Sequence, residues 1–108
     1  MLLAIVLGFL GGLMGVNSLP HFIKGVAHES FPMAFGNTPV RNAVAGWVGL
    51  VISGVLLYFA DIPAHPEVAL GLTAVGALLA AVYHASGRAA QSLEKGKAKK
   101  AAEAGKAG

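Results

Sequence analysis

Four histidines are the side chains of this chain best suited to bind a metal ion or a cofactor. A neutral imidazole is a common ligand of metal ions and of haem iron. His21 and His84 each stand near the end of an apolar stretch, so two adjacent helices could bring them together as a bis-histidine site. His28 and Glu29 are sequence neighbours that could share a metal ion. These residues lack the close spacing of a metal-binding motif, so hydrogen bonding inside the protein is the first interpretation and a ligand site is the alternative.

The remaining polar residues do not form a recognisable catalytic set. The chain has no cysteine, which excludes disulfides, thiolate metal sites and cysteine nucleophiles. No glycine-rich sequence follows a strand and opens a helix, as nucleotide-binding motifs require. The serines lack the neighbours of a catalytic nucleophile. We therefore expect that the chain is not an enzyme.

The expected architecture follows from three long stretches that contain no Lys, Arg, Asp or Glu. They are residues 1–23, 42–60 and 68–87. A helix rises about 1.5 Å per residue, so about 20 apolar residues cross the hydrocarbon of a bilayer. The chain is 56% hydrophobic and only 12% charged, whereas soluble domains are about a quarter charged. The sequence predicts an all-α integral membrane bundle of three transmembrane helices, with residues 1–87 as the membrane domain and residues 88–108 as a basic cytoplasmic tail.

Proline and capping residues indicate where the helices begin and end. Pro20 is expected to end a first helix over Leu2–Leu19. Thr38 is a good N-cap before a second helix over Pro39–Ala60, and the third helix is expected over Pro66–Ser86. A cleaved signal peptide is the alternative for the first helix. No basic residue precedes its apolar core, so we expect the segment to be retained.

The connection between the first two helices, residues 20–38, is long for a helical bundle and rich in apolar side chains. The first interpretation is a segment that lies in the membrane interface, with Lys24 reaching toward the lipid headgroups. The alternative is a re-entrant or capping segment that packs under the bundle and lines a site. Irregular backbone at membrane depth has to be buried in protein or line a cavity.

Part of the first half of the chain follows a specific pattern. The pattern consists of Asn-Ser-Leu-Pro-His-Phe-Ile-Lys-Gly at residues 17–25, Phe-Pro-Met-Ala-Phe at residues 31–35, and Asn42 with Gly46 and Trp47. It resembles a family of small uncharacterised bacterial integral membrane proteins, and Asn-x-x-Pro-His-Phe is its most specific part. The chain departs from that family at Ala34, where the relatives have a second proline. The resemblance implies a bacterial inner membrane and brings no assigned activity.

Small residues recur on one face of each expected helix. They are Gly8, Gly11, Gly12 and Gly15 in the first helix, Gly46, Gly49 and Ser53, with Asn42 on the same face, in the second, and Thr73, Ala77, Ala80 and Ala81, with His84 on the same face, in the third. Patterns of small residues four positions apart let membrane helices approach closely. We expect these faces to hold a tight three-helix bundle or, as the alternative, to mediate self-association.

The charges predict an orientation in the membrane. The tail after Gly87 has six basic and two acidic residues, the connection over residues 24–41 has two basic residues and one acidic residue, and the connection over residues 61–67 has two acidic residues and no basic one. Basic segments stay cytoplasmic. We therefore expect the N-terminus outside and the tail in the cytoplasm, either solvated or bound to anionic headgroups. Nucleic acid is not an expected partner, because no aromatic residue accompanies the lysines of the tail.

Two classes of function remain. The first is a structural or accessory integral membrane protein that packs in the lipid bilayer through its small-residue faces, against itself or within a larger membrane complex. The second is a module that binds haem, a metal ion or a quinone through the cytoplasmic-side histidines. This second class is the alternative, because the histidines have no metal signature of their own.

Overall fold

The computed structural model describes residues 1–31, 33 and 36–107. Over these residues the chain is all-helical and has no strand. Its helices are α1 (Leu2–Val26), α2 (Pro39–Tyr58), α3 (Pro66–Ala85) and α4 (Arg88–Ala107). The first three helices are long and apolar enough to span a membrane. The predicted fold class, an all-α protein with three candidate membrane spans, is therefore confirmed.

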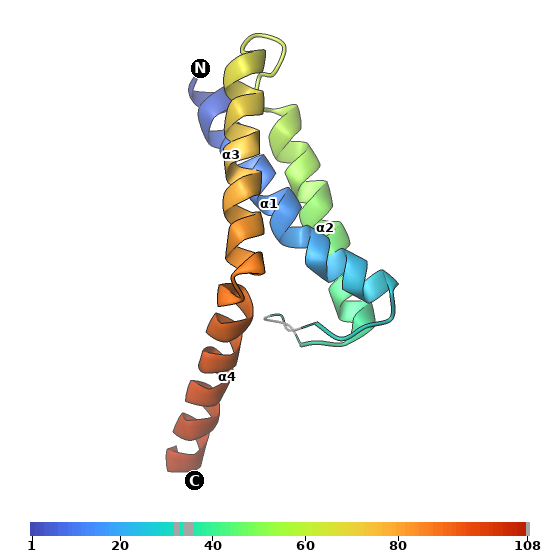
Figure 1. Ribbon diagram of the computed structural model, residues 1–108, viewed down its shortest axis with the longest axis vertical. Helices are drawn as coiled ribbons and strands as arrows, with labels where there is room; N and C mark the ends of the chain where they lie inside the picture. The colour runs from blue at the N-terminus through green and yellow to red at the C-terminus, as the bar shows by residue number, and fades with distance from the viewer. Residues whose placement is uncertain (32, 34–35, 108) are drawn as a thin grey trace.

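Helix α1 is the centre of the fold. Helices α2 and α3 both pack against it, and over the residues described they do not approach each other closely. Figure 1 shows the N-terminus and the α2–α3 connection at one end of the molecule, and the α1–α2 connection and α4 at the other. The molecule is 57 Å long, because α4 extends beyond the three packed helices.

Helix α1 is longer than predicted, because Pro20 does not end it. The sequence predicts an end at Leu19, whereas the helix continues through Pro20 to Val26. A proline inside a helix removes one backbone hydrogen bond and usually kinks or breaks the helix. Here the last turns of α1 pack against α2, where Gly46 lies directly against the backbone of Phe22. Tertiary packing therefore outweighs the local cost of the proline.

Helices α2 and α3 begin where predicted, at Pro39 and Pro66. Proline is well suited to the first helical position, where its missing N–H would have no partner inside the helix. The Thr38 side chain caps α2 by accepting a hydrogen bond from the backbone N–H of Arg41 at 3.4 Å. Both helices end one or two residues before the predicted ends, which is the usual precision of helix boundaries.

The basic tail is helical too. It is separated from α3 by Gly87, whose φ of 77° is a conformation that favours glycine. The Gly87 N–H donates to the carbonyl of His84 at 3.0 Å, which completes the last turn of α3. Four lysines of α4 are exposed: Lys95, Lys97, Lys99 and Lys100. Both interpretations of the tail, solvated or bound to anionic headgroups, stay predictions.

Helix α1 approaches α3 through glycine. Gly8 and Gly12 lie directly against the backbone of Ala69 and Thr73 of α3. A methyl group at either position would overlap a backbone carbonyl group of α3. The absence of a side chain therefore sets the distance between the two helices.

A second glycine face of α1 meets α2. Gly11 and Gly15 lie against the side chains of Leu57 and Ser53, and the Ser53 hydroxyl donates a buried hydrogen bond of 2.7 Å to the Gly11 carbonyl. The small residues of α2 that face α1 are Gly46, Gly49 and Ser53. The four glycines predicted to share one face of α1 therefore contact two different helices. Gly8 and Gly12 contact α3, and Gly11 and Gly15 contact α2.

The buried face of α3 matches the predicted one only in part. Ala80 is buried and Thr73 lies against Gly12, as predicted. Ala77 is only half-buried and Ala81 is exposed, whereas the buried residues are Ala69, Gly76 and Ala80. The reason is Gly76, which lies against the backbone of Phe9 in a space that admits no side chain. Helix α3 is therefore rotated so that its glycine, rather than the Ala77 and Ala81 edge, meets α1.

Candidate functional site

Asn42 is a fully buried polar side chain on the first turn of α2. Its Nδ2 donates to the carbonyl of Phe31 at 2.9 Å and to the carbonyl of Thr38 at 3.0 Å. Its Oδ1 is 2.9 Å from Nδ1 of His21 on α1. Because both amide hydrogens are used on carbonyl groups, the amide oxygen must accept, and Nδ1 of His21 is the donor.

A second asparagine holds the histidine of α3. Nε2 of His84 lies 2.8 Å from Oδ1 of Asn17 on α1, and the ring nitrogen donates this bond. Asn17 and His21 are one turn apart on α1, so their side chains lie on adjacent parts of one face. The two hydrogen bonds join α1 to α2 and to α3 near the same end of the molecule.

The structure brings the two histidines together. The ring centroids of His21 and His84 are 6.2 Å apart, and the ring planes are nearly perpendicular at 81°. The predicted approach of these two residues is therefore confirmed. In the neutral form each ring uses one nitrogen to donate to an asparagine, so its other nitrogen carries a lone pair that can accept a hydrogen bond or bind a metal ion. Metal-binding histidines usually have such a hydrogen bond on the second nitrogen.

The connection between α1 and α2 packs against this site. The Phe31 ring contacts His21 edge-on at a centroid distance of 5.1 Å, and Met33 is only 5% exposed. These two contacts attach the connection to the bundle, whereas residues 27–30 and 37–38 are exposed. The interfacial and the capping interpretations of this connection both stay predictions. Pro32, Ala34 and Phe35, which complete the family-like pattern, lie outside the described residues.

His28 and Glu29 are placed apart from the histidine pair. His28 is exposed and has a φ of 60°, and the Glu29 carboxylate forms a 2.5 Å ion pair with Nζ of Lys24. Over residues 1–31, 33 and 36–107, no group of three or more His, Cys, Asp or Glu residues could hold a metal ion. The structure therefore supplies no further ligand for the predicted metal pair.

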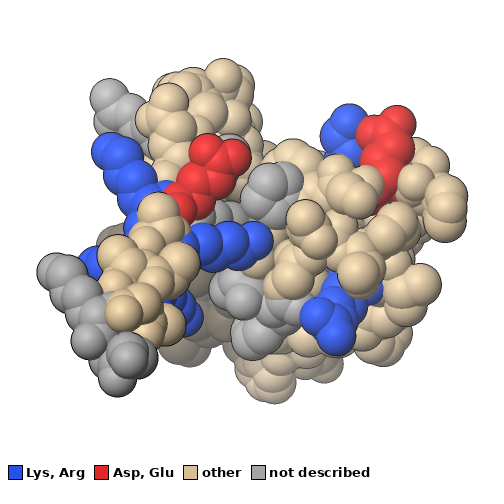
Figure 2. All heavy atoms as spheres, turned by 90° about the horizontal axis from the view of Figure 1, so that it is seen from below, with Lys and Arg blue, Asp and Glu red and all other residues tan. Residues whose placement is uncertain are grey.

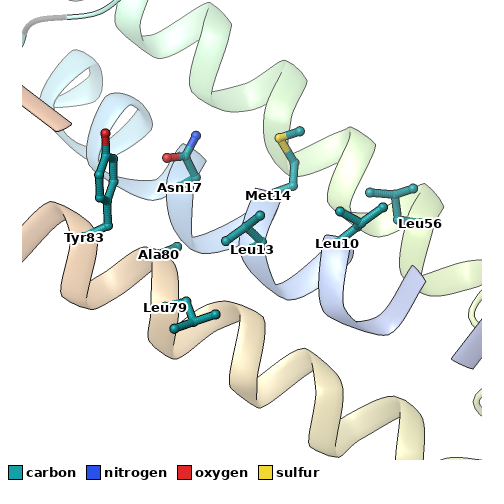
Figure 3. A pocket seen from close by; sticks show the side chains of 8 residues that line it. All are labelled: Leu10, Leu13, Met14, Asn17, Leu56, Leu79, Ala80 and Tyr83. Carbon is teal, nitrogen blue, oxygen red and sulfur yellow. The ribbon is translucent and has the colours of Figure 1, made fainter. Parts of the chain in front are cut away.

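An apolar groove of about 380 Å³ runs along α1, between α2 and α3. Its lining residues are Leu10, Leu13, Met14, Asn17, Leu56, Leu79, Ala80 and Tyr83. Figure 3 shows Asn17 and Tyr83 at one end of the groove and Leu10 and Leu56 at the other. The groove exists because α2 and α3 both pack on α1 but not on each other.

A second hollow of about 300 Å³ adjoins the groove. The two share Met14 and Asn17, and the second hollow is also lined by Ser18, His21 and Met33. The apolar groove therefore ends beside the histidine site. The groove could not be predicted from the sequence, although Leu10, Leu13 and Asn17 share one helix face, opposite the four glycines.

Comparison of the chain with protein-family models, with curated proteins and with solved structures finds no match. The class of the protein therefore rests on the fold and the site themselves. Both define an all-helical protein with three candidate membrane spans and a histidine–asparagine site at the end that carries α4.

Proposed function

We propose that the chain is a small accessory integral membrane protein of the bacterial inner membrane. It would pack as a subunit of a larger membrane complex or as a homo-oligomer. The observation that carries this proposal is the small share of each span that the fold buries. Between 17% and 28% of the residues in the most apolar part of each candidate span are buried. The outer faces of α2 and α3 are therefore left for lipid and for other membrane helices.

The orientation is part of the proposal: the N-terminus is outside and α4 is in the cytoplasm. Lys24, Arg41 and the lysines of α4 lie toward one end, and Asp61 and Glu67 lie at the other. Figure 2, which views the molecule from the α4 end, shows Lys and Arg side chains spread over this face. The rule that basic segments stay in the cytoplasm supports this orientation.

Photo-crosslinking in native membranes tests the accessory role. A photoreactive amino acid at Val51 samples the outer face of α2, and one at Leu78 samples that of α3, because these side chains are 46% and 63% exposed. The control position is Ala4, which is fully buried inside the protein. We expect a discrete product with another chain, either a second copy or a different protein, from Val51 or Leu78 but not from Ala4. Products with lipid alone at both positions would contradict the proposal.

A second candidate function is binding of haem or a metal ion by His21 and His84. The 6.2 Å separation of their rings favours it, together with the hydrogen bond that each ring donates to an asparagine. The purified protein should then bind haem or Zn²⁺, and both His21→Ala and His84→Ala should lose binding. His65→Ala, which changes the histidine at the other end of α3, is the matched control. Equal binding by all three variants would rule out the histidine pair as the site.

A further inference from the structure

We propose that the groove between α2 and α3 binds a neutral membrane amphiphile. Its apolar tail would lie along α1, and its hydroxyl-bearing head would lie beside Asn17 and His21. Isoprenoid quinols and isoprenoid alcohols both have this chemistry. The proposal goes beyond the accessory role and does not depend on it, because it concerns a small ligand rather than a protein partner.

The groove has the size and lining of a site for a single tail. Its volume of about 380 Å³ falls in the usual range for small-molecule pockets, roughly 300–1,000 Å³. From Leu10 to Asn17 it follows α1 for about 10 Å, at 1.5 Å per residue. Leucine and methionine side chains from all three packed helices line this length. The groove is open along the candidate membrane spans, so a tail can enter it sideways from the hydrocarbon.

The polar end of the groove favours a neutral head. Neither the groove nor the adjoining hollow is lined by a Lys, Arg, Asp or Glu side chain among the residues that the structure describes. A charged headgroup would therefore be taken out of water without a partner, which is unfavourable. This absence of charge argues against the phosphate of a phospholipid at this position.

The hydrogen-bonding groups at this end favour a hydroxyl. Nδ1 of His21 must donate to Asn42, so Nε2 of the neutral ring is an acceptor. His21 lines the hollow that adjoins the groove. The amide of Asn17, which lines both spaces, has hydrogens to donate. A hydroxyl can donate to the histidine and accept from the asparagine, whereas a carbonyl can only accept.

Ligand binding to the full chain in phosphatidylcholine nanodiscs tests the proposal. The probes are decylubiquinol, decylubiquinone and farnesol, measured as ligand retained per protein after gel filtration. Leu79→Trp fills the groove, and Leu78→Trp puts the same side chain on the outer face of α3 as a matched control. We expect Leu79→Trp to weaken decylubiquinol binding by about tenfold or more, and Leu78→Trp by less than about twofold.

The outcomes distinguish the two candidate classes of ligand, a quinol and an isoprenoid alcohol. Tighter binding of decylubiquinol than of decylubiquinone and farnesol identifies a quinol, and comparable binding of decylubiquinol and farnesol identifies an isoprenoid alcohol. Binding of decylubiquinone as tight as that of the quinol would contradict the hydroxyl-bearing head. Equal binding by the Leu79→Trp and Leu78→Trp variants would overturn the groove as the site. Two chains per nanodisc with no retained ligand would assign the groove to a second copy instead.

Thermal unfolding of each variant separates loss of the site from loss of the fold. Asn17→Leu removes the polar group that the groove and the adjoining hollow share. It also removes the acceptor of His84, so its effect on stability has to be measured. Leu79 is half exposed and makes no polar contact, so Leu79→Trp should keep the fold and test the groove by itself. These results do not depend on whether crosslinking finds a protein partner.

Discussion

Gly12 of α1 lies directly against the backbone carbonyl group of Thr73 of α3. Gly12→Ala should therefore push the two helices apart, and Gly12→Leu should do so more strongly. Forcing extra carbon atoms into a close-packed contact typically costs about 1–3 kcal/mol. We expect both variants to unfold at a lower temperature in detergent, with a larger decrease for Gly12→Leu.

Gly71→Ala is the matched control for this prediction. Gly71 lies on α3, and a methyl group there would meet nothing within 4 Å. Alanine is a better helix former than glycine by about 1 kcal/mol, so this variant should be unchanged or slightly more stable. A Gly12→Leu protein as stable as the Gly71→Ala protein would show that the α1–α3 contact does not hold the fold.

Asn42 should be more important for stability than an exposed asparagine. Asn42→Leu leaves the Phe31 carbonyl and Nδ1 of His21 without their partners. A buried polar group without a partner costs about 1–3 kcal/mol. The expected result is a marked decrease of the unfolding temperature in detergent, measured by circular dichroism. Asn37→Leu, at an exposed position in the connection just before α2, should have little effect, and equal effects of the two changes would contradict this prediction.

The number of apolar helices and their first residues could be predicted from the sequence, because uncharged length and proline position are local signals. Thr38 and Pro39 mark the start of α2 in the sequence and in the structure. The end of α1 could not be predicted in this way. Pro20 is a local signal to stop, and the contact between Phe22 and Gly46 that overrides it joins residues far apart in the chain.

The candidate site also has one part that the sequence predicts and one part that it does not. The approach of His21 and His84 follows from two spans that end at one face, so it could be predicted. Asn42 could be placed on the packing face of the second helix with Gly46, Gly49 and Ser53, and these four residues are buried. The pairing of Asn42 with His21 and of Asn17 with His84 could not be assigned, because the sequence does not specify how α1, α2 and α3 are rotated about their axes. The same rotation exposes Ala81 and buries Gly76, which reverses the expectation for that edge of α3. The groove depends on this rotation as well, because it lies between α2 and α3, which both pack against α1 without approaching each other closely over the described residues.

The proximity of His21 and His84 can be tested by crosslinking. A chain with His21→Cys and His84→Cys should be linked by a short bifunctional thiol reagent, because the two positions face each other between α1 and α3. The native chain has no cysteine, so the background is low. The control pair is His65→Cys with His84→Cys. These positions are separated by the whole length of α3, about 28 Å at 1.5 Å per residue, and should not be linked.

The proposed orientation can be tested with reporters that are active on one side of the membrane only. A reporter that works only in the cytoplasm should be active when fused after Gly108 and inactive when inserted within residues 62–65. The physical reason is the excess of basic residues in the tail, so replacing Lys95, Lys97, Lys99 and Lys100 by glutamine should produce a mixture of orientations. Replacing Glu94 and Glu103 by glutamine is the control, because acidic residues contribute little to orientation. Activity within residues 62–65 together with no activity after Gly108 would show that the chain is inserted the other way round.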